Sequence, residues 1–218
     1  MRLVLGSPVR CADSPFGELA DVVIDPISRR VTHLVVQPEH QHEAARLVSI
    51  DRAQSTADGI RLDLSAEELE RLEPLQEAAF LRFGEFPVED PDWEVGIQQM
   101  LALPLYPGAD GIVSSIDPDA LVPWSYDRVP KGEIELRRSS AVTSADGHHL
   151  GHVDGFLVED DVIVAVVLER GHLWGRREVV IPYGAVEHAE SDSIVLSLTK
   201  DEVGALEGAR VHRWFSVG

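Results

Sequence analysis

Apolar and polar residues alternate over several short stretches in the first third of this sequence. Residues 46–50 (RLVSI) and 60–64 (IRLDL) both alternate, and residues 31–36 (VTHLVV) are rich in β-branched side chains. Both patterns are typical of β-strands. The turn pair Asp58-Gly59 stands directly before the second alternating stretch. We therefore predict a series of short strands in this part of the chain.

The same pattern returns near the C-terminus, which indicates an internal repeat. Three blocks align without gaps and in the same order, and the aligned pairs are 3–13 with 136–146, 31–50 with 162–181, and 60–69 with 194–203. They share five identities in eleven positions, six in twenty and four in ten. We predict a duplicated unit of about 70 residues, with five or six short strands that form a small barrel or sandwich.

Each copy closes with the sequence signature of a helix start. The pairs Ser65–Glu68 and Thr199–Glu202 both place a hydroxyl three residues before a glutamate. This is the capping-box spacing, in which the hydroxyl and the carboxylate each bind a backbone N–H group of the first turn. The pattern predicts two short helices, which run through Leu72 and to about Leu206.

Residues 73–132 interrupt the repeat with a different composition. They contain eight prolines and 11 acidic residues against three basic ones, as a flexible linker does, yet they are too apolar for plain disorder. We predict short helices at residues 75–83 and 94–103, in an insert that packs on its neighbours while its acidic Pro/Gly stretches are mobile. The predicted domains are a first barrel at 1–72, the partly helical acidic insert at 73–132, and a second barrel with a C-terminal aromatic tail at 133–218.

Both copies carry the same turn and strand motifs. Each opens with a small-residue turn (Gly6-Ser7-Pro8-Val9 and Ser139-Ser140-Ala141-Val142), followed by an aspartate and then a glycine, Gly17 or Gly151. Two apolar strands around an acidic turn and an Arg-x-Val-x-Ile block complete each copy. This arrangement resembles the PRC-barrel family, whose barrel is shared by the photosynthetic reaction centre H subunit and the ribosome maturation factor. The resemblance covers about 70 residues in each half and leaves out the insert.

The resemblance implies a mainly β fold of two small PRC-like β-barrels in tandem. It also implies a non-enzymatic module that docks protein partners, and many members of the family are bacterial proteins. Roles within the family extend from electron-transfer complexes to RNA processing. The function expected from the resemblance is therefore binding or scaffolding.

Charge and composition narrow the possible roles. The chain has 38 acidic against 19 basic residues and a formal net charge of −19, so we expect no direct binding of nucleic acid. Its one cysteine, Cys11, excludes an internal disulfide. The longest apolar run, residues 162–168, is too short to span a membrane, and we expect a cytoplasmic protein.

The sequence contains none of the common catalytic or cofactor motifs. Gly-x-Ser-x-Gly, Gly-x-Gly-x-x-Gly, P-loop and His-Glu-x-x-His patterns are all absent from it. The acidic residues stand mostly in turns and helix starts, where they favour caps. We predict that the protein is not an enzyme, with no catalytic residue and no cofactor.

Histidines gather in the stretch 146–154 (DGHHLGHVD), which contains His148, His149 and His152. Neutral imidazole is a common zinc ligand, and three ligands are typical of a catalytic site. However, the aligned turn of the first copy, residues 13–17 (DSPFG), closes without histidine. We interpret the stretch as a turn that carries exposed histidines and predict no metal site; metal binding is the alternative hypothesis.

A second loop, residues 171–175 (GHLWG), places Trp174 between two glycines. Arg170, Arg176 and Arg177 flank it, and tryptophan and arginine are enriched in binding hot spots. The loop is a candidate for partner binding. The alternative is a tryptophan folded over the end of the barrel, because this residue is usually largely buried.

Three functions are consistent with these features. The first is a protein-interaction or scaffold protein without catalytic activity. The second is an accessory factor in ribosome or RNA maturation, which would dock a basic ribosomal protein by charge. The third is a metal- or small-ligand-binding protein that uses the histidine turn. A homodimer, formed through exposed strand edges or the C-terminal aromatic residues, is a further expectation.

Overall fold

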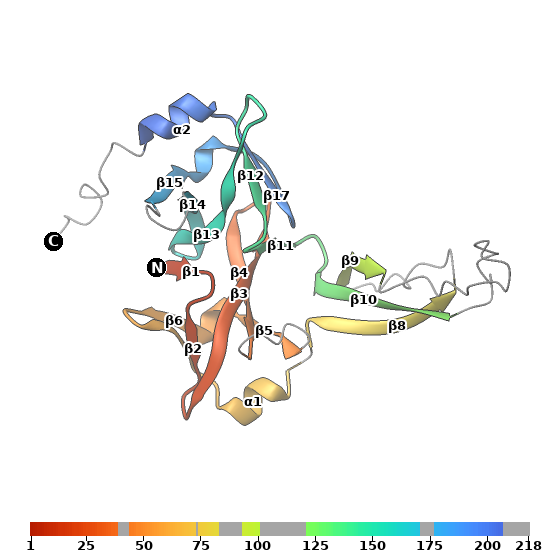
Figure 1. The fold of residues 1–218 in the computed structure, drawn as a ribbon. Helices are drawn as coiled ribbons and strands as arrows, with labels where there is room; N and C mark the ends of the chain where they lie inside the picture. The colour runs from red at the N-terminus through yellow and green to blue at the C-terminus, as the bar shows by residue number, and fades with distance from the viewer. Residues whose placement is uncertain (39–43, 73, 83–92, 101–120, 171–176, 207–218) are drawn as a thin grey trace, which may run out of the picture.

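The computed structural model describes residues 1–38, 44–72, 74–82, 93–100, 121–170 and 177–206 (Figure 1). The strands before the insert are β1 (Arg2–Val4), β2 (Pro8–Arg10), β3 (Pro15–Asp25), β4 (Arg30–Gln37), β5 (Arg46–Ser49), β6 (Ala53–Thr56) and β7 (Gly59–Leu62). The strands after it are β11 (Ile134–Arg137), β12 (Ala141–Thr143), β13 (His149–Glu159), β14 (Val162–Arg170), β15 (Arg177–Pro182), β16 (Val186–Glu190) and β17 (Ser193–Leu196). The prediction of a mainly β chain is confirmed.

The two halves of the chain pair their strands in the same way. In the first half, β3 pairs antiparallel with β4, β4 with β5, and β6 with β7, while β2 lies antiparallel to β3 and parallel to β7. In the second half, β13 pairs antiparallel with β14, β14 with β15, and β16 with β17, while β12 lies antiparallel to β13 and parallel to β17. A long central hairpin therefore organises each half.

The first strand of each half pairs with a strand of the other half. Strand β1 pairs antiparallel with β13, and Leu3 lies opposite Phe156. Strand β11 pairs antiparallel with β3, and Leu136 lies opposite Val22. All four side chains are fully buried. Each half therefore completes its sheet and its core with a strand that the other half provides.

The two central hairpins also meet directly. The backbone N–H of Val31 donates to the carbonyl of Asp161 at 2.7 Å, and the N–H of Ile163 donates to the carbonyl of Arg29 at 2.9 Å. These contacts and the exchanged strands join all strands outside the insert into one 14-stranded sheet, which does not close on itself. One buried core runs through both halves. The two separate barrels therefore remain a prediction.

Both predicted helices are present. α1 (Ala66–Glu70) follows β7, and α2 (Lys200–Leu206) follows β17. At α1 the Ser65 hydroxyl accepts from the backbone N–H of Glu68 at 3.2 Å, and the carboxylate of Glu68 accepts from the backbone N–H of Ser65 at 2.8 Å. The corresponding bonds between Thr199 and Glu202 measure 3.4 and 2.8 Å.

The capping-box prediction is therefore confirmed at both sites. α1 ends two residues earlier than expected, because Arg71 and Leu72 lie in the turn that follows it. Single 3-10 turns, η2 (Ile50–Arg52) and η3 (Tyr183–Ala185), precede β6 and β16. None of the helices in the described segments is long and apolar enough to cross a membrane.

The insert is built from strands, so the prediction of helices at 75–83 and 94–103 is wrong where the structure describes these residues. β8 (Gln76–Arg82), β10 (Leu121–Pro130) and β9 (Trp93–Met100) form a three-stranded antiparallel sheet in that order. Alanine, glutamate and leucine favour helices locally, but pairing with the β-prone strand β10 determines the conformation here. Residues 83 and 101–103 lie outside the described part of the chain.

The three-stranded sheet is fastened to the first half at its base. Leu75 and Val129 are buried in a second small core, with Ala20, Val23 and Val35 on the opposite face of the central hairpin from the main core. The N–H of Leu75 also donates to the carbonyl of Ala45 at 3.0 Å. From this base the strands extend away from the body (Figure 1). We call β8, β9 and β10 the arm.

Candidate functional site

The histidine turn connects β12 to β13, and its conformation does not depend on the imidazole rings. The backbone N–H of Ser144 donates to the carbonyl of His148 at 2.9 Å, and the Ser144 hydroxyl accepts from the His148 N–H at 3.1 Å. Gly147 and Gly151 have φ angles of 78° and 145°, which L side chains rarely adopt. Serine and glycine thus form the turn.

The three histidine side chains are exposed and find different neighbours. His148 Nδ1 lies 3.1 Å from Asp146 Oδ2. The rings of His149 and His152 stack edge to face, with their centroids 5.1 Å apart. Among the described residues, no group of three histidine, cysteine, aspartate or glutamate side chains is arranged to hold a metal ion. The turn therefore brings two of the histidines together and leaves the third on an aspartate.

The aspartate before each turn binds the start of the nearby helix. Asp13 Oδ1 accepts from the backbone N–H of Ala66 at 3.0 Å, and Asp146 Oδ1 accepts from that of Lys200 at 3.1 Å. The Ala66 N–H lowers the pKa of Asp13 below its ordinary value. For Asp146 the Ser144 hydroxyl is the main cause of a lowered pKa, and the Lys200 N–H adds to it. Both carboxylates have a structural role.

Residues 171–176 of the tryptophan loop, including Trp174, lie outside the described part of the chain. The strands that lead into it are described. Arg170 at the end of β14 lies opposite Arg177 at the start of β15. The loop therefore connects the two ends of one hairpin, as the sequence predicted for it.

Charged side chains are buried where the halves exchange strands, a feature that sequence reasoning missed. Glu135 on β11 is almost fully buried, and its Oε2 accepts from Arg137 Nε at 2.9 Å. The carboxylate of Asp21 on β3 is also buried and accepts from the backbone N–H of Arg138 at 2.8 Å. Both bonds compensate the burial of polar groups. The bond between Asp21 and Arg138 also joins the residue after β11 to the first half, whereas Glu135 and Arg137 pair within β11.

A second polar cluster links the halves near the base of the arm. Thr32 Oγ1 donates to Glu133 Oε2 at 2.5 Å, and His33 Nδ1 lies 3.1 Å from the same hydroxyl and 3.6 Å from the carboxylate. Thr32 and His33 are neighbours on β4, whereas Glu133 stands directly before β11. Hydroxyl, imidazole and carboxylate thus connect two segments of the chain, and Thr32 and Glu133 are 101 residues apart in the sequence.

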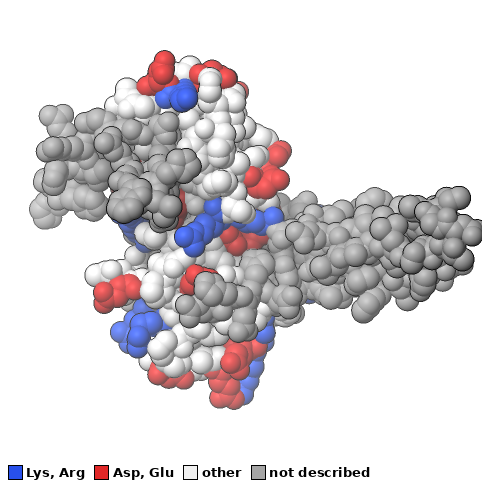
Figure 2. Space-filling model, in the orientation of Figure 1, with Lys and Arg blue, Asp and Glu red and all other residues white. Residues whose placement is uncertain are grey.

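Two hollows open on the body. One, of about 570 Å³, lies between η2 and the β13–β14 turn and is lined by Met1, Ile50, Ala53, Val158, Glu159, Asp160 and Asp161. The other, of about 340 Å³, lies beside β2 and β7 and is lined by Arg10, Cys11, Ala12, Asp13, Ser14, Thr56, Asp58, Gly59, Ile60 and Arg61. Over the face drawn in Figure 2, acidic and basic side chains are interspersed. We call the second hollow the β2–β7 cleft. Two arginines, Arg10 and Arg61, line it.

The arm has the most distinctive distribution of residue types. Positions directly opposite one another in antiparallel strands share a face of the sheet. The register pairs Val122 with Leu81, Trp124 with Met100, and Tyr126 with Ile97. Trp93 and Val95, which lie opposite Pro130 and Arg128, continue this face, and Glu77 and Arg128 are its charged positions. We call this set of positions the apolar face of the arm.

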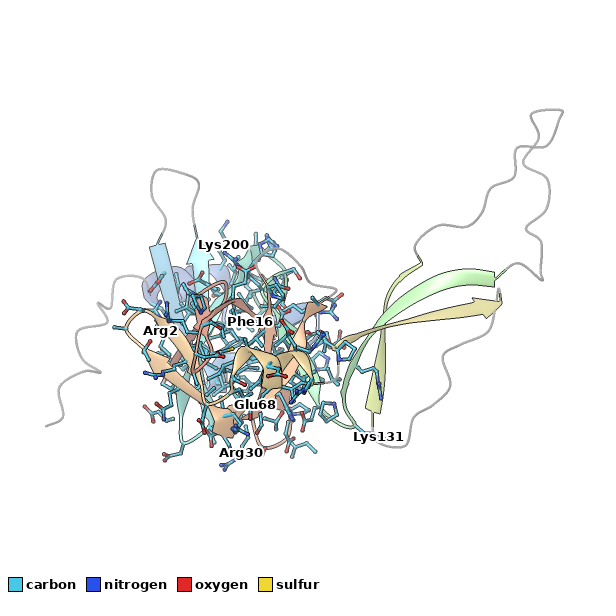
Figure 3. All side chains as sticks on the ribbon, turned by 90° about the horizontal axis from the view of Figure 1, so that it is seen from below. Arg2, Phe16, Arg30, Glu68, Lys131 and Lys200 are labelled. Atoms are coloured by element: carbon cyan, nitrogen blue, oxygen red, sulfur yellow. The ribbon has the colours of Figure 1, made fainter. Side chains whose placement is uncertain are left out.

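The alternate positions of the arm are more polar. They include Gln76, Glu94, Gln99, Ser125 and Asp127, together with the apolar residues Phe80, Leu121, Pro123 and Val129. Figure 3 shows the arm from below, with Lys131 where it rejoins the body. One face of the arm is therefore more apolar than the other, as in a sheet that is covered on one side.

No protein-family model matches this chain, and a search of curated proteins found no match either.

Proposed function

We propose that this chain is a tandem PRC-barrel-like protein that binds a protein partner and has no catalytic activity. The matching strand pairings of the two halves support the duplication. So do the corresponding contacts of Asp13 with Ala66 and of Asp146 with Lys200. The reciprocal exchange of β1 and β11 has the symmetry that two copies of one unit would produce.

The apolar face of the arm is the observation that carries the binding function. A small sheet needs packing against another element for stability, and an apolar sheet face is one that is covered on that side. Leu75 and Val129, at the base of the arm, belong to a described core of the body. Two tryptophans and a tyrosine stand on this face, and these residue types are enriched in binding hot spots. We therefore place the partner on the arm.

The charge of the insert supports a basic protein as the partner. Residues 73–132 contain 11 acidic against three basic residues. Such a segment attracts a basic protein electrostatically and raises its rate of association. A basic ribosomal protein has this chemistry, so a role as an accessory factor in ribosome maturation is a specific form of the same proposal.

The experiment is capture of partners by the full chain, followed by their identification. The test variant combines Trp124→Ser with Tyr126→Ser on the apolar face. Its matched control combines Ser125→Ala with Asp127→Asn on the neighbouring positions of the opposite face. Both variants should melt at the wild-type temperature for the body, because they leave Leu75 and Val129, which join the arm to the body core, unchanged.

We expect the wild-type chain and the control to retain the same basic protein, and the test variant to lose it. Retention should also weaken as salt is raised, because screening reduces the charge attraction. A partner that is retained equally by all three chains would contradict the role of the arm, and an acidic partner would contradict the charge argument.

A further inference from the structure

Two arginines lie side by side in the β2–β7 cleft. Arg10 is directly opposite Arg61 in the parallel pairing of β2 with β7, and the preceding pair is Val9 with Ile60. Val9 and Ile60 are buried in the core, whereas both arginines are exposed. Since successive side chains of a strand point to opposite faces, both arginine side chains project from the outer face of this strand pair. The strands are about 4.8 Å apart.

Neither arginine is neutralised within the part of the chain that the structure describes. No hydrogen bond or ion pair of Arg10 or Arg61 is formed there, whereas Arg2 binds Glu178 at 2.6 Å. Two carboxylates, Asp13 and Asp58, also line the cleft, and the Oδ1 of Asp13 accepts from the backbone N–H of Ala66. Within the described residues neither carboxylate forms an ion pair with Arg10 or Arg61. Like charges directly opposite one another destabilise a strand pair. An anion bound between them would remove this repulsion.

The rest of the cleft suits a small ligand. Its volume of about 340 Å³ lies at the lower end of the range for small-molecule sites. Cys11, only 4% exposed, lines it, and burial raises the pKa of this thiol, so that it stays neutral. The thiol therefore adds no negative charge to that of the two carboxylates in the cleft. Asp58 also lines the cleft and can accept a hydrogen bond from a hydroxyl or amino group.

The fold does not require the arginine pair. At the corresponding place in the second half, Thr143 on β12 lies opposite Val195 on β17 in the same parallel pairing. The two strands thus pair equally well with uncharged residues. The charges belong to the first half alone, in a chain whose net charge is −19.

We propose that the β2–β7 cleft binds a small anionic molecule through a phosphate or carboxylate group held between Arg10 and Arg61. Guanidinium groups bind both kinds of oxyanion in bidentate geometry. This site is independent of the arm and goes beyond the proposed binding of a protein partner.

The test is titration of the full chain with inorganic phosphate, and separately with succinate, at constant ionic strength. Amide NMR signals report the binding site, and calorimetry reports the affinity. We expect saturable binding with shifts at Cys11, Gly59 and Arg61. The double variant Arg10→Gln/Arg61→Gln should bind at least roughly tenfold more weakly, because charged hydrogen bonds are lost. The control is Arg30→Gln, an exposed arginine beside Asp161.

Thermal melting gives a second readout that does not depend on the NMR spectrum. Without anion, the double variant should melt at or above the wild-type temperature, because repulsion is relieved. Added ligand should raise the melting temperature of the wild type and of Arg30→Gln but not that of the double variant. The probe that binds with the higher affinity, phosphate or succinate, shows whether the site prefers a phosphate or a carboxylate group. Equal binding by wild type and double variant, or no saturable binding of either probe, would overturn the proposal.

Discussion

At the scale of single residues, Asp13 and Asp146 show how a carboxylate can hold a turn against a distant helix. Each accepts a hydrogen bond from the first residue of the helix that follows more than 50 positions later. Both have a pKa below the ordinary value of 3.8. A group with a lowered folded-state pKa stabilises the fold above its unfolded pKa, and this contribution is lost as the pH falls through the folded value.

We therefore predict that Asp146→Asn lowers the melting temperature at pH 7, and that the difference from wild type shrinks as the pH falls below about 4. In acid the wild-type carboxyl is protonated too, so the two chains become alike. Melting curves between pH 2 and 7 measure this. Asp201→Asn, in the first turn of the same helix, is the control. A difference from wild type that stays constant with pH would show that the charge of Asp146 is not the cause.

The histidines of the same turn permit a second prediction. Combined replacement of His148, His149 and His152 by alanine should leave the metal content and the melting temperature of the protein unchanged. The reason is that Ser144 and the glycines form the turn, and the rings are exposed. Elemental analysis and melting of the purified protein test this. Loss of a bound metal in the variant would restore the metal-site hypothesis.

At the scale of elements, the exchanged strands depend on close backbone approach. A Cβ atom added at Gly155 on β13 would lie 2.2 Å from the carbonyl oxygen of Leu3 on β1. Real side chains do not tolerate such a distance, so β1 would have to move. At Gly184, in η3, an added Cβ would meet nothing within 4 Å. The two glycines form a matched pair for substitution.

We predict that Gly155→Ala destabilises the protein by about 1–3 kcal/mol, the range for overpacked sites. Gly184→Ala should change the stability by no more than about 0.5 kcal/mol. Denaturant unfolding of both variants measures these values. Equal stability of the two variants would mean that β1 is not packed on β13 in solution.

The capping boxes, and many of the strands, were predictable because their signals are local. Ser65 and Glu68 are three residues apart, and alternation is visible within four or five residues. The strands of the arm were not, because Glu77, Ala78 and Ala79 favour a helix when considered alone. Pairing with β10, more than 40 residues further along the chain, determines their conformation.

Two further features could not be predicted from the sequence for a related reason: the exchange of β1 and β11, and the arginine pair. Leu3 and Phe156 are far apart in the sequence, and nothing near either residue indicates the other. Arg10 and Arg61 become neighbours only through the parallel pairing of β2 with β7. The histidine turn, in contrast, is recognisable in the sequence because its residues are adjacent there. Adjacency does not bring the three rings together, however.

At the scale of the whole molecule, the exchange makes one folding unit of two halves. Leu136 on β11 is buried in a core that includes residues from both halves. We predict that Leu136→Ala lowers the free energy of unfolding by about 2–5 kcal/mol. Hydrogen exchange should then accelerate to a similar extent in β3 and β13. Val164→Ala, at an exposed site, is the control. Faster exchange confined to the first half would show that the halves unfold separately.

The exchange of strands also bears on how the chain is made. β13 begins at His149, about 145 residues after β1 ends at Val4. At about 5–20 residues per second, β1 leaves the ribosome roughly 7–30 s before its partner is synthesised. During this interval β3 lacks β11, so its edge from Asp21 to Ile24 is open to pairing with other chains. A nascent chain that stalls within the insert will therefore expose an aggregation-prone strand edge, which β11 covers once it has been synthesised.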